Sequence, residues 1–542
     1  MTSRNGSDLK MYFYTGISGF LLTLAFPDFS FFFIAWAALF PFLTAISDID
    51  GKAAFKAGFF MGIVHYSSLM YWTIYAMRIY GYMPYYMCIP AFLLFIFYLA
   101  LYPAFFALLF SKLMNHVDSH GESPVIILCL TPSIWTALEY IRSILFTGLP
   151  WELLGASQHN FLHIIQIADI FGVYGISFLI VLVNTMLFII QKSMRNDSWG
   201  IERRHLYICG VITLALVSAA LYYGEQRITN LDAGADKWTY KTFSVIQGNI
   251  DQSLKWDKSY QNEVITKYIS LSLKAGAENP DLIVWPETST PFYFGIDPLK
   301  TKMVIEGLKP AGAYFLIGSP AADKKEITSS EKSFSEDVML YYNRAYLLDP
   351  NGDIIGSYDK SHLVPFGEYV PLKHLFPFIG KLVQEIGDFS SGKKGSIIEW
   401  NGNKIGVLIC FEQVFPYLLR ALSENGADVL VNITNDAWFG MTSAPYQHFS
   451  MGVFRAVESR KSLIRAANTG KSGFIDPVGR VVAETEIFED AELTKQMPLN
   501  NETTVYVRFG DWFAVFCLLT GFIGVLIVSS HKYNSDLSDL HD

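Results

Sequence analysis

The chain alternates between long apolar stretches and a central region of mixed polarity. A helix that crosses a bilayer needs roughly 20 apolar residues, and runs of about this length occur eight times in the sequence. They cover residues 11–27, 31–47, 57–77, 88–111, 124–144, 162–190, 205–223 and 510–530. Seven runs precede the central region and one follows it. The pattern therefore predicts a membrane α-helical bundle of eight transmembrane helices.

The central region has the patterning of a soluble domain and carries most of the charge. Strand-like runs lie at 243–247, 281–285, 314–318, 338–348, 404–409, 428–433 and 463–467, and helical periodicity at 258–275, 413–424 and 446–461. This alternation is typical of layered α/β domains. We expect three parts: residues 1–224 with seven spans, a soluble domain at 225–508, and the eighth span with a tail at 509–542.

Composition and loop charge agree with a membrane protein. The chain is 51% hydrophobic and 15% aromatic, with a mean hydropathy of +0.28, which is too apolar for an ordinary soluble enzyme. If the N-terminus is cytoplasmic, the inner segments hold ten basic residues: Arg4, Lys10, Lys52, Lys56, Lys112, Lys192, Arg195, Arg203, Arg204 and Lys532. The outer loops hold Arg78 and Arg142. The positive-inside rule then predicts a soluble domain outside the cytoplasm.

Charge and cysteine content exclude several classes of function. The net charge is −9 and the soluble region carries no basic stripe, which argues against a nucleic-acid partner. Of the five cysteines, Cys88, Cys129, Cys209 and Cys517 lie within predicted spans, whereas Cys410 lies outside them. One cysteine and scattered histidines do not suggest a metal site, and no phosphate-binding glycine loop is apparent. We therefore expect neither a metal nor another cofactor.

Chemically capable side chains follow three of the predicted strands. Glu287 lies in "IVWPETSTP", Lys360 and Glu368 in "YDKSHLVPFGEYVP", and Cys410 in "VLICFEQ". Taken singly, Glu287 fits a helix-capping or surface carboxylate, Lys360 a solvated lysine and Cys410 a buried structural cysteine. A thiol needs a lowered pKa or a nearby base to act as a nucleophile, and a helix starting after Cys410 would favour the anion. Together, a base, a cation and a thiol suit acyl transfer.

The order and context of these residues resemble a known family. "WPE", "YDK…PFGEYVP" and "CFE" resemble the Glu-Lys-Cys triad of the nitrilase superfamily, which implies an α-β-β-α sandwich for the soluble domain. Fusion of such a domain to eight spans resembles the apolipoprotein N-acyltransferases. Further matching segments are "IQGNIDQSLKW" at 246–256, "HLVPFGEYVP" at 362–371, "NDAWFG" at 435–440 and "TGLPWELLGASQ" at 147–158. The resemblance extends over nearly the whole chain.

The resemblance implies a role for each matching residue. Glu287 would be the general base, Lys360 the oxyanion stabiliser and Cys410 the nucleophile. Supporting or substrate-binding positions would be Glu368, Glu412, Trp256, Phe411, Asn435 and Trp438. Phe411 stands where tyrosine is common in the family, so a hydroxyl contributed there is not available in this chain.

The implied reaction is a ping-pong acyl transfer. Cys410 would take a fatty acyl chain from a phospholipid as a thioester and pass it to the N-terminal amine of the S-diacylglyceryl-cysteine of a lipoprotein. The family places such proteins in the bacterial inner membrane with the catalytic domain on the periplasmic side. The partners would be phospholipid, lipoprotein and bilayer, and the protein a monomer because one chain holds every group. The apolar segment 371–387, with Lys373 and Lys381, is expected at the membrane interface or packed on the domain.

Three other functions are compatible with parts of the sequence. A membrane-tethered nitrilase-type amidase would use the same triad with water as acceptor. A transporter or scaffold would retain the outer domain without activity. A Cys-His protease would use His362, His374 or His448 as its base.

The membrane region offers few groups for chemistry of its own. Glu139 and Arg142, spaced i,i+3 on one span, are expected to form a structural ion pair, and Asp169 lies near the start of another span. We expect residues 147–158 to form an outer loop that docks the catalytic domain or admits lipid.

Overall fold

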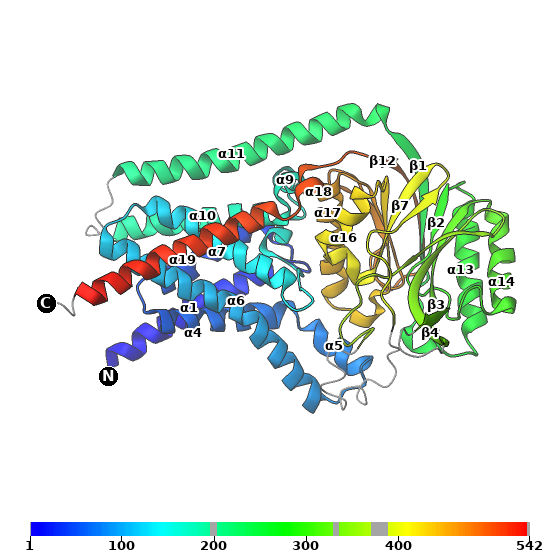
Figure 1. Cartoon of the computed structure of the whole chain (residues 1–542), viewed down its shortest axis with the longest axis horizontal. Helices are drawn as coiled ribbons and strands as arrows, with labels where there is room; N and C mark the ends of the chain where they lie inside the picture. Colours follow the sequence, from blue (N-terminus) through cyan, green and yellow to red (C-terminus); the bar gives the residue numbers. More distant parts are fainter. Residues whose placement is uncertain (1, 196–202, 329–334, 370–388, 539–542) are drawn as a thin grey trace. The chain divides into compact units, whose positions relative to one another are not determined.

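The computed structural model describes residues 2–195, 203–328, 335–369 and 389–538. The chain divides into two compact units (Figure 1). The first comprises Met1–Asn230 with Phe509–Asp542, and the second comprises Leu231–Arg508. We call them the helical unit and the α/β unit. The segment 371–387 and His374 lie outside the described residues.

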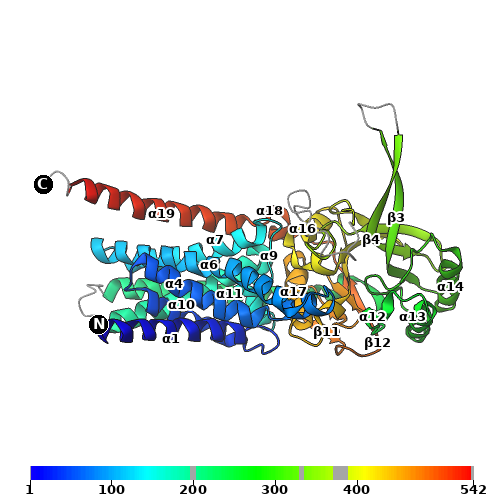
Figure 2. The same ribbon diagram turned by 90° about the horizontal axis from the view of Figure 1, so that it is seen from below.

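The helical unit is a bundle in which long helices lie side by side (Figures 1 and 2). Its α-helices are α1 (Thr2–Leu24), α2 (Ala35–Ala38), α3 (Phe40–Ile46), α4 (Gly51–Leu69), α5 (Trp72–Ile79), α6 (Tyr85–His120), α7 (Pro124–Ile144), α8 (Leu162–Ile165), α9 (Ala168–Phe171), α10 (Val173–Arg195), α11 (Arg203–Gly234) and α19 (Trp512–Ser538). The 3₁₀ turns η1 (Phe32–Ile34) and η2 (Leu154–Gln158) connect some of them. Helices α4 and α6, α1 and α4, α7 and α10, and α7 and α19 pack together.

The prediction of eight spans is supported in part. Among the described residues, four helices are long and apolar enough to cross a membrane: α6, α7, α10 and α11. Three predicted runs are not continuous helices. Residues 31–47 form η1, α2 and α3, residues 57–77 divide between α4 and α5, and residues 162–190 divide among α8, α9 and α10. Apolar composition predicts burial or lipid contact, but it does not show where a helix breaks.

A buried amide on α10 explains the break within residues 31–47. The backbone N–H groups of Leu39 and Phe40 donate to Asn184 Oδ1 at 2.9 and 3.0 Å, and Asn184 Nδ2 donates to the carbonyl of Ala35 at 2.9 Å. Pro41 contributes no N–H to the turn that follows. An apolar setting requires every backbone polar group to have a partner, so Asn184 supplies the bonds that a continuous helix would have made.

Glu139 and Arg142 bind a backbone segment rather than forming the expected ion pair. Glu139 Oε1 accepts the N–H of Leu154 at 2.7 Å. Arg142 donates to the carbonyls of Trp151 and Glu152 and to the hydroxyl of Tyr66 at 3.3, 3.4 and 2.7 Å. Sequence spacing places both side chains on one face of α7, but it does not reveal that a loop presents its unpaired backbone groups to that face. The two charged residues therefore fasten segment 151–154.

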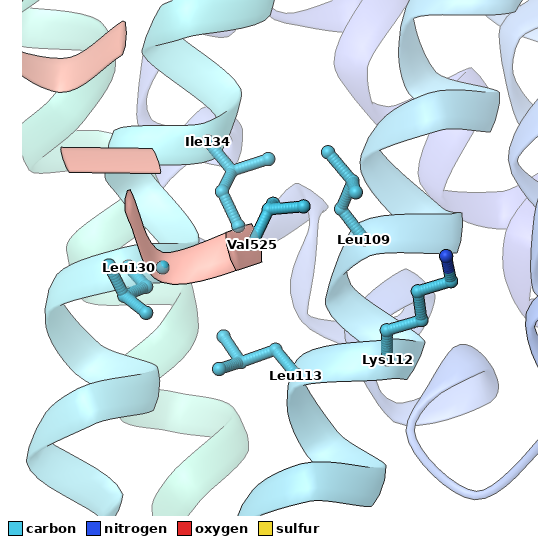
Figure 3. A pocket seen from close by; sticks show the side chains of 7 residues that line it. Leu109, Lys112, Leu113, Leu130, Ile134 and Val525 are labelled. Atoms are coloured by element: carbon cyan, nitrogen blue, oxygen red, sulfur yellow. The ribbon is translucent and has the colours of Figure 1, made fainter. Parts of the chain in front are cut away.

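Helix α19 follows the α/β unit in the chain and packs in the helical unit against α6 and α7. Figure 3 shows Val525 beside Leu109 of α6 and Ile134 of α7, around a small apolar pocket that Leu113, Leu130 and Gly524 also line.

Asp169 of α9 accepts hydrogen bonds from Tyr223 and Arg227 of α11, so its charge is paired within the helical unit.

The described part of the α/β unit contains two six-stranded sheets. The first has the order β12-β1-β2-β3-β4-β5 and the second β11-β10-β9-β8-β7-β6. The strands are β1 (Thr239–Gln247), β2 (Leu282–Val284), β3 (Tyr314–Thr328), β4 (Ser335–Leu348), β5 (Ile354–Asp359), β6 (Ile397–Trp400), β7 (Asn403–Ile409), β8 (Val429–Thr434), β9 (Leu463–Ala467), β10 (Gly473–Ile475), β11 (Val481–Glu484) and β12 (Ala491–Leu499). Neighbours β1, β2 and β3 run parallel, as do β7, β8 and β9.

All seven predicted strands are present, and the predicted helices correspond to α13 (Gln261–Gly276), α16 (Pro416–Glu424) and α17 (Ala444–Ser459). Among the described residues, five strands and three helices were not predicted: β5, β6, β10, β11, β12, α12 (Gln252–Lys255), α14 (Pro298–Leu308) and α18 (Val505–Phe509). Most of the missed strands lie toward sheet edges and mix polar with apolar residues. Their strand conformation depends on pairing with a neighbour.

The α/β unit is layered as helix, sheet, sheet, helix, which confirms the expected sandwich in the described residues. Helices α13 and α14 cover the first sheet, and α16 and α17 cover the second (Figure 1). Val245, Val284 and Leu316 of the first sheet meet Val407 and Val431 of the second in one core. The alternate residues of the first sheet, such as Ile246 and Ile283, point toward α13 and α14. Because successive side chains of a strand point to opposite faces of the sheet, the first sheet contributes apolar residues to both cores.

Candidate active site

Cys410 occupies a sharp turn at the end of a buried strand. Strand β7 ends at Ile409, and Cys410 then adopts a φ of 55°, in the left-handed region that few residues other than glycine favour. A 3₁₀ turn, η6 (Cys410–Val414), follows, and α16 begins later, at Pro416. The cysteine therefore does not stand at the N-terminus of an α-helix, contrary to the sequence-based expectation that a helix dipole would favour its thiolate.

Glu287 and Lys360 lie beside each other in the same site. Glu287 follows β2 and Lys360 follows β5, and both side chains are buried. Lys360 Nζ lies 2.9 Å from Glu368 Oε1 and 3.6 Å from Glu287 Oε1. Asn343 of β4 donates from Nδ2 to Glu287 at 2.7 Å and to Glu368 at 3.1 Å. The structure thus brings Glu287, which follows β2, next to Lys360 and Glu368, which lie in the segment after β5.

The electrostatics of the cluster keep the lysine charged and the thiol protonated. Burial alone lowers the pKa of Lys360, but the carboxylates of Glu368 and Glu287 raise that pKa well above its usual value. Burial and the neighbouring Glu287 raise the pKa of Cys410, which the charge of Lys360 opposes. A thiol in this setting requires a base to remove its proton during reaction.

Glu412 connects the cysteine loop with the lysine loop. Its Oε1 accepts the N–H groups of Ser361 and His362 at 2.7 and 2.9 Å, and its Oε2 accepts the N–H of Ile409 at 2.8 Å. The hydroxyl of Tyr358 donates to the same fully buried carboxylate. Glu412 thereby fixes the residues next to Lys360 against the residue preceding Cys410.

The other predicted site residues lie around this cluster in different environments. The backbone N–H of Asn435 donates to Glu287 Oε2 at 2.9 Å. Phe411 packs edge-on against Phe415. Trp256 and Trp438 are 50% and 40% exposed, so both could contact a large substrate.

Sequence reasoning missed Asn343, Gln252 and Lys255. Asn343 occupies the same face of β4 as the core residues Ala345 and Leu347, so a polar residue at a core-facing position was the available signal. Gln252 accepts from the side chain of Asn435 at 2.7 Å. Lys255 is fully buried and donates to the hydroxyl of Thr288 at 2.7 Å, and burial lowers its pKa to about 8.

The described histidines that were considered as bases contact other groups. His448 Nε2 lies 3.2 Å from the carbonyl oxygen of Cys410, and His362 Nδ1 lies 2.6 Å from the hydroxyl of Tyr417. Burial lowers the pKa of His362 to about 4. These contacts do not favour the Cys-His protease. Within the described residues, no group of three or more His, Cys, Asp and Glu side chains is placed to hold a metal ion.

Comparison with known proteins identifies the family to which this arrangement belongs. Residues 18–186 match the model of the apolipoprotein N-acyltransferase N-terminal domain, and residues 242–528 match the carbon-nitrogen hydrolase model. A protein of Geobacter metallireducens named apolipoprotein N-acyltransferase is 42% identical over 94% of this chain and 93% of its own length. The chain belongs to the apolipoprotein N-acyltransferase family. A member from Rickettsia prowazekii is 31% identical over 88% of this chain and 89% of its own.

The carbon-nitrogen hydrolase match also places the α/β unit of this N-acyltransferase family member in the nitrilase-like fold. An amidase from Nesterenkonia sp. is similar to 50% of this chain over 92% of its own, with 18% identity and a TM-score of 0.34. The apolar helices and the family together identify a membrane protein.

Proposed function

We propose that the chain transfers a fatty acyl group from a phospholipid to the N-terminal amine of an S-diacylglyceryl-cysteine lipoprotein. The observation that carries the proposal is the cluster of buried Glu287 and Lys360 with the partly buried Cys410, in a chain whose helical unit also matches the N-acyltransferase family. Glu287, Lys360 and Cys410 act as base, oxyanion stabiliser and nucleophile.

In the first half-reaction, Glu287 removes the proton from the Cys410 thiol as sulfur attacks the ester carbonyl carbon of the phospholipid. The carbonyl oxygen becomes an oxyanion, and the Lys360 ammonium stabilises it. One such donor is typically worth about 3 kcal/mol of barrier. The carbon–oxygen bond then breaks, and the proton held by Glu287 passes to the departing lysophospholipid oxygen. The acyl group remains on Cys410 as a thioester.

In the second half-reaction, the free amine of the lipoprotein attacks the thioester carbonyl. Glu287 takes a proton from the attacking nitrogen, the carbon–sulfur bond breaks, and the thiol regains its proton. The product is an amide. Glu368 holds Lys360 and, through Asn343, shares a hydrogen-bond donor with Glu287. Trp256 and Trp438, both partly exposed, contact substrate, and Phe411 and Asn435 complete the surroundings.

The proposal includes the setting of the reaction. The helical unit crosses the bacterial inner membrane eight times, the α/β unit lies on the periplasmic side, and the protein acts as a monomer on lipid and lipoprotein from the bilayer. The excess of basic residues in the loops on the side of the N-terminus supports this orientation.

A membrane-tethered amidase would use the same three residues on a small substrate. The N-acyltransferase is favoured because the family match includes the helical unit at residues 18–186, which an amidase would need only as an anchor.

Mass spectrometry of the purified protein after incubation with phospholipid tests the proposal. We expect a mass increase of one fatty acyl group on Cys410 that hydroxylamine removes and that Cys410→Ala lacks. Glu287→Gln should prevent the adduct, and Lys360→Ala should slow its formation by roughly 100- to 1,000-fold.

The variant Lys302→Ala, which removes a lysine of α14, serves as the control and should form the adduct at the wild-type rate. Consumption of a small amide without any acyl adduct from phospholipid would instead establish the amidase. Normal adduct formation by Glu287→Gln or Lys360→Ala would remove that residue from its assigned role.

A further inference from the structure

The carbonyl group of the nucleophile is held by side chains that the mechanism above does not use. The oxygen of Cys410 accepts hydrogen bonds from Asn432 Nδ2 at 3.3 Å and from His448 Nε2 at 3.2 Å. Asn432 belongs to β8, the neighbour of β7, and His448 belongs to α17. A residue other than glycine held at a φ of 55° is strained by roughly 1–3 kcal/mol, so the turn at Cys410 depends on such contacts.

His448 can make this bond only when Nε2 carries a proton, because Cys410 O is an acceptor. Burial and the positive charge of Arg465 lower the pKa of His448, whereas the charge of Asp436 raises it. Its Nδ1 lies 2.9 Å from Asp436 Oδ1 and 3.0 Å from Arg465 Nη2. Arg465 and Asp436 thus hold the ring with Nε2 directed at Cys410 O.

Arg465 also sets the orientation of Asn432. Its Nη1 donates to Asn432 Oδ1, which leaves the amide nitrogen of Asn432 to donate to Cys410 O and to the carbonyl of Leu408 at 3.1 Å. One guanidinium therefore directs two different donors toward the carbonyl of the nucleophile. All three side chains are fully buried.

A carboxylate holds Arg465 in place. Asp436 Oδ2 accepts from Arg465 Nη2 at 2.8 Å. Although burial by itself raises the pKa of Asp436, Arg465 and His448 lower it to about 2, so the carboxylate is charged at neutral pH. Asp436 Oδ1 also accepts from the hydroxyl of Thr434 at 2.9 Å and lies 2.9 Å from His448 Nδ1, so the same carboxylate contacts Arg465 and His448.

We propose that Arg465 positions the nucleophile by orienting His448 and Asn432 onto the carbonyl of Cys410. These are positioning residues, since they act on the cysteine backbone and not on the substrate. The inference rests on the proposed role of Cys410 as the acyl carrier. It predicts that losing the donor on His448 slows acylation of Cys410 without weakening the binding of the acyl donor.

Two amide substitutions of different length test this. In His448→Gln, the amide nitrogen reaches the place of Nε2 and can still donate to Cys410 O. In His448→Asn, the amide reaches only the place of Nδ1. The measurement is the pre-steady-state burst of nitrophenol from a p-nitrophenyl fatty ester in detergent-solubilised full-length protein. We expect the saturating burst rate of His448→Asn to fall about 10- to 100-fold with an unchanged half-saturating ester concentration. His448→Gln should stay within about threefold of the wild type.

Controls separate positioning from folding. His163→Asn changes an exposed histidine of the helical unit and should leave the burst unchanged. If His448→Asn does not fold, Asn432→Asp provides the second test, because it keeps an acceptor for Arg465 but loses the donor to Cys410 O, and it should slow the burst similarly. Wild-type burst rates in a folded His448→Asn or Asn432→Asp protein would overturn the inference, as would equal slowing in His448→Gln and His448→Asn.

The ester also distinguishes this inference from the proposed function. A wild-type protein that is acylated by the ester but never by phospholipid overturns the proposed function, and the comparison of the two amide variants still decides the role of His448.

Discussion

At the scale of single residues, Cys410 combines a strained backbone with a thiol that resists ionisation. Its φ of 55° directs it out of the strand, while burial and Glu287 raise its pKa. A permanently ionised thiolate would react with many electrophiles. In the proposed mechanism, the thiol loses its proton only to Glu287 and therefore reacts when an acyl donor is correctly placed.

The raised pKa of Cys410 predicts how alkylation depends on pH. Below the pKa, the thiolate fraction grows about tenfold per pH unit, so the iodoacetamide rate at Cys410 should rise steadily from pH 7 to 9 without a plateau. Glu287→Gln removes a negative charge that disfavours the thiolate and should therefore increase this rate. Peptide mapping by mass spectrometry measures the modification of Cys410 separately from that of the other four cysteines. A plateau already at pH 7, or slower alkylation of Glu287→Gln, would contradict the prediction.

At the scale of elements, buried polar side chains form hydrogen bonds with the backbone groups of segments that are not regular helix. Asn184 binds the interrupted helix at residues 35–40, and Glu139 with Arg142 binds segment 151–154. In an apolar environment, each unpaired N–H or C=O group is costly, so these side chains determine where the chain can depart from helix.

Replacing Asn184 by leucine should destabilise the helical unit. The substitution leaves the N–H groups of Leu39 and Phe40 and the carbonyl of Ala35 without their partner, at about 1–3 kcal/mol for each buried group. We expect a clear decrease in the melting temperature in detergent, measured by the exposure of buried cysteines to a thiol-reactive dye. Asn115→Leu, at an exposed position of α6, is the matched control and should change the melting temperature little. Equal melting temperatures for the two variants would show that Asn184 does not support the break.

At the scale of the whole molecule, the α/β unit is inserted into the helical unit between α11 and α19. Its first and last strands, β1 and β12, pair antiparallel, from Thr239 opposite Leu499 to Gln247 opposite Ala491. The two points where the chain enters and leaves the unit are therefore close together, and the unit has its own cores. Such an insertion leaves the folding of the inserted unit largely self-contained.

Residues 231–508 should consequently fold when expressed alone. We expect cooperative thermal unfolding by circular dichroism and alkylation of Cys410, but no transfer of acyl groups from phospholipid to lipoprotein. A fragment that ends at Asp490 lacks β12 and exposes the edge of β1, so it should aggregate or remain unfolded. If 231–508 shows no cooperative transition, the α/β unit depends on the helical unit for its stability.

Particular residues show which strands and site residues could be predicted from the sequence and which could not. Strands β2, β7 and β8 are apolar runs of the right length, and Glu287 and Cys410 follow such runs, so local pattern located them. Lys255 and His448 lie within helices and carry no local mark of their roles, and Asn343 is marked only as a polar residue at a core-facing position of β4. Their partners are distant in sequence: Asn343 meets Glu287 across 56 residues, and His448 meets Cys410 across 38. The edge strands β11 and β12 also lacked a signal, because their pairing partners decide their conformation.

The sequence by itself determined the membrane character, the layered α/β domain, the family and the segments that carry Glu287, Lys360 and Cys410, because periodicity and local motifs are properties of neighbouring residues. Only the tertiary structure decided where the apolar runs break, that Glu139 and Arg142 bind a loop, and that Arg465 orients two donors onto Cys410. Those features arise from contacts between distant segments in buried surroundings, where the direction of a hydrogen bond and the charge of a group depend on what packs around them.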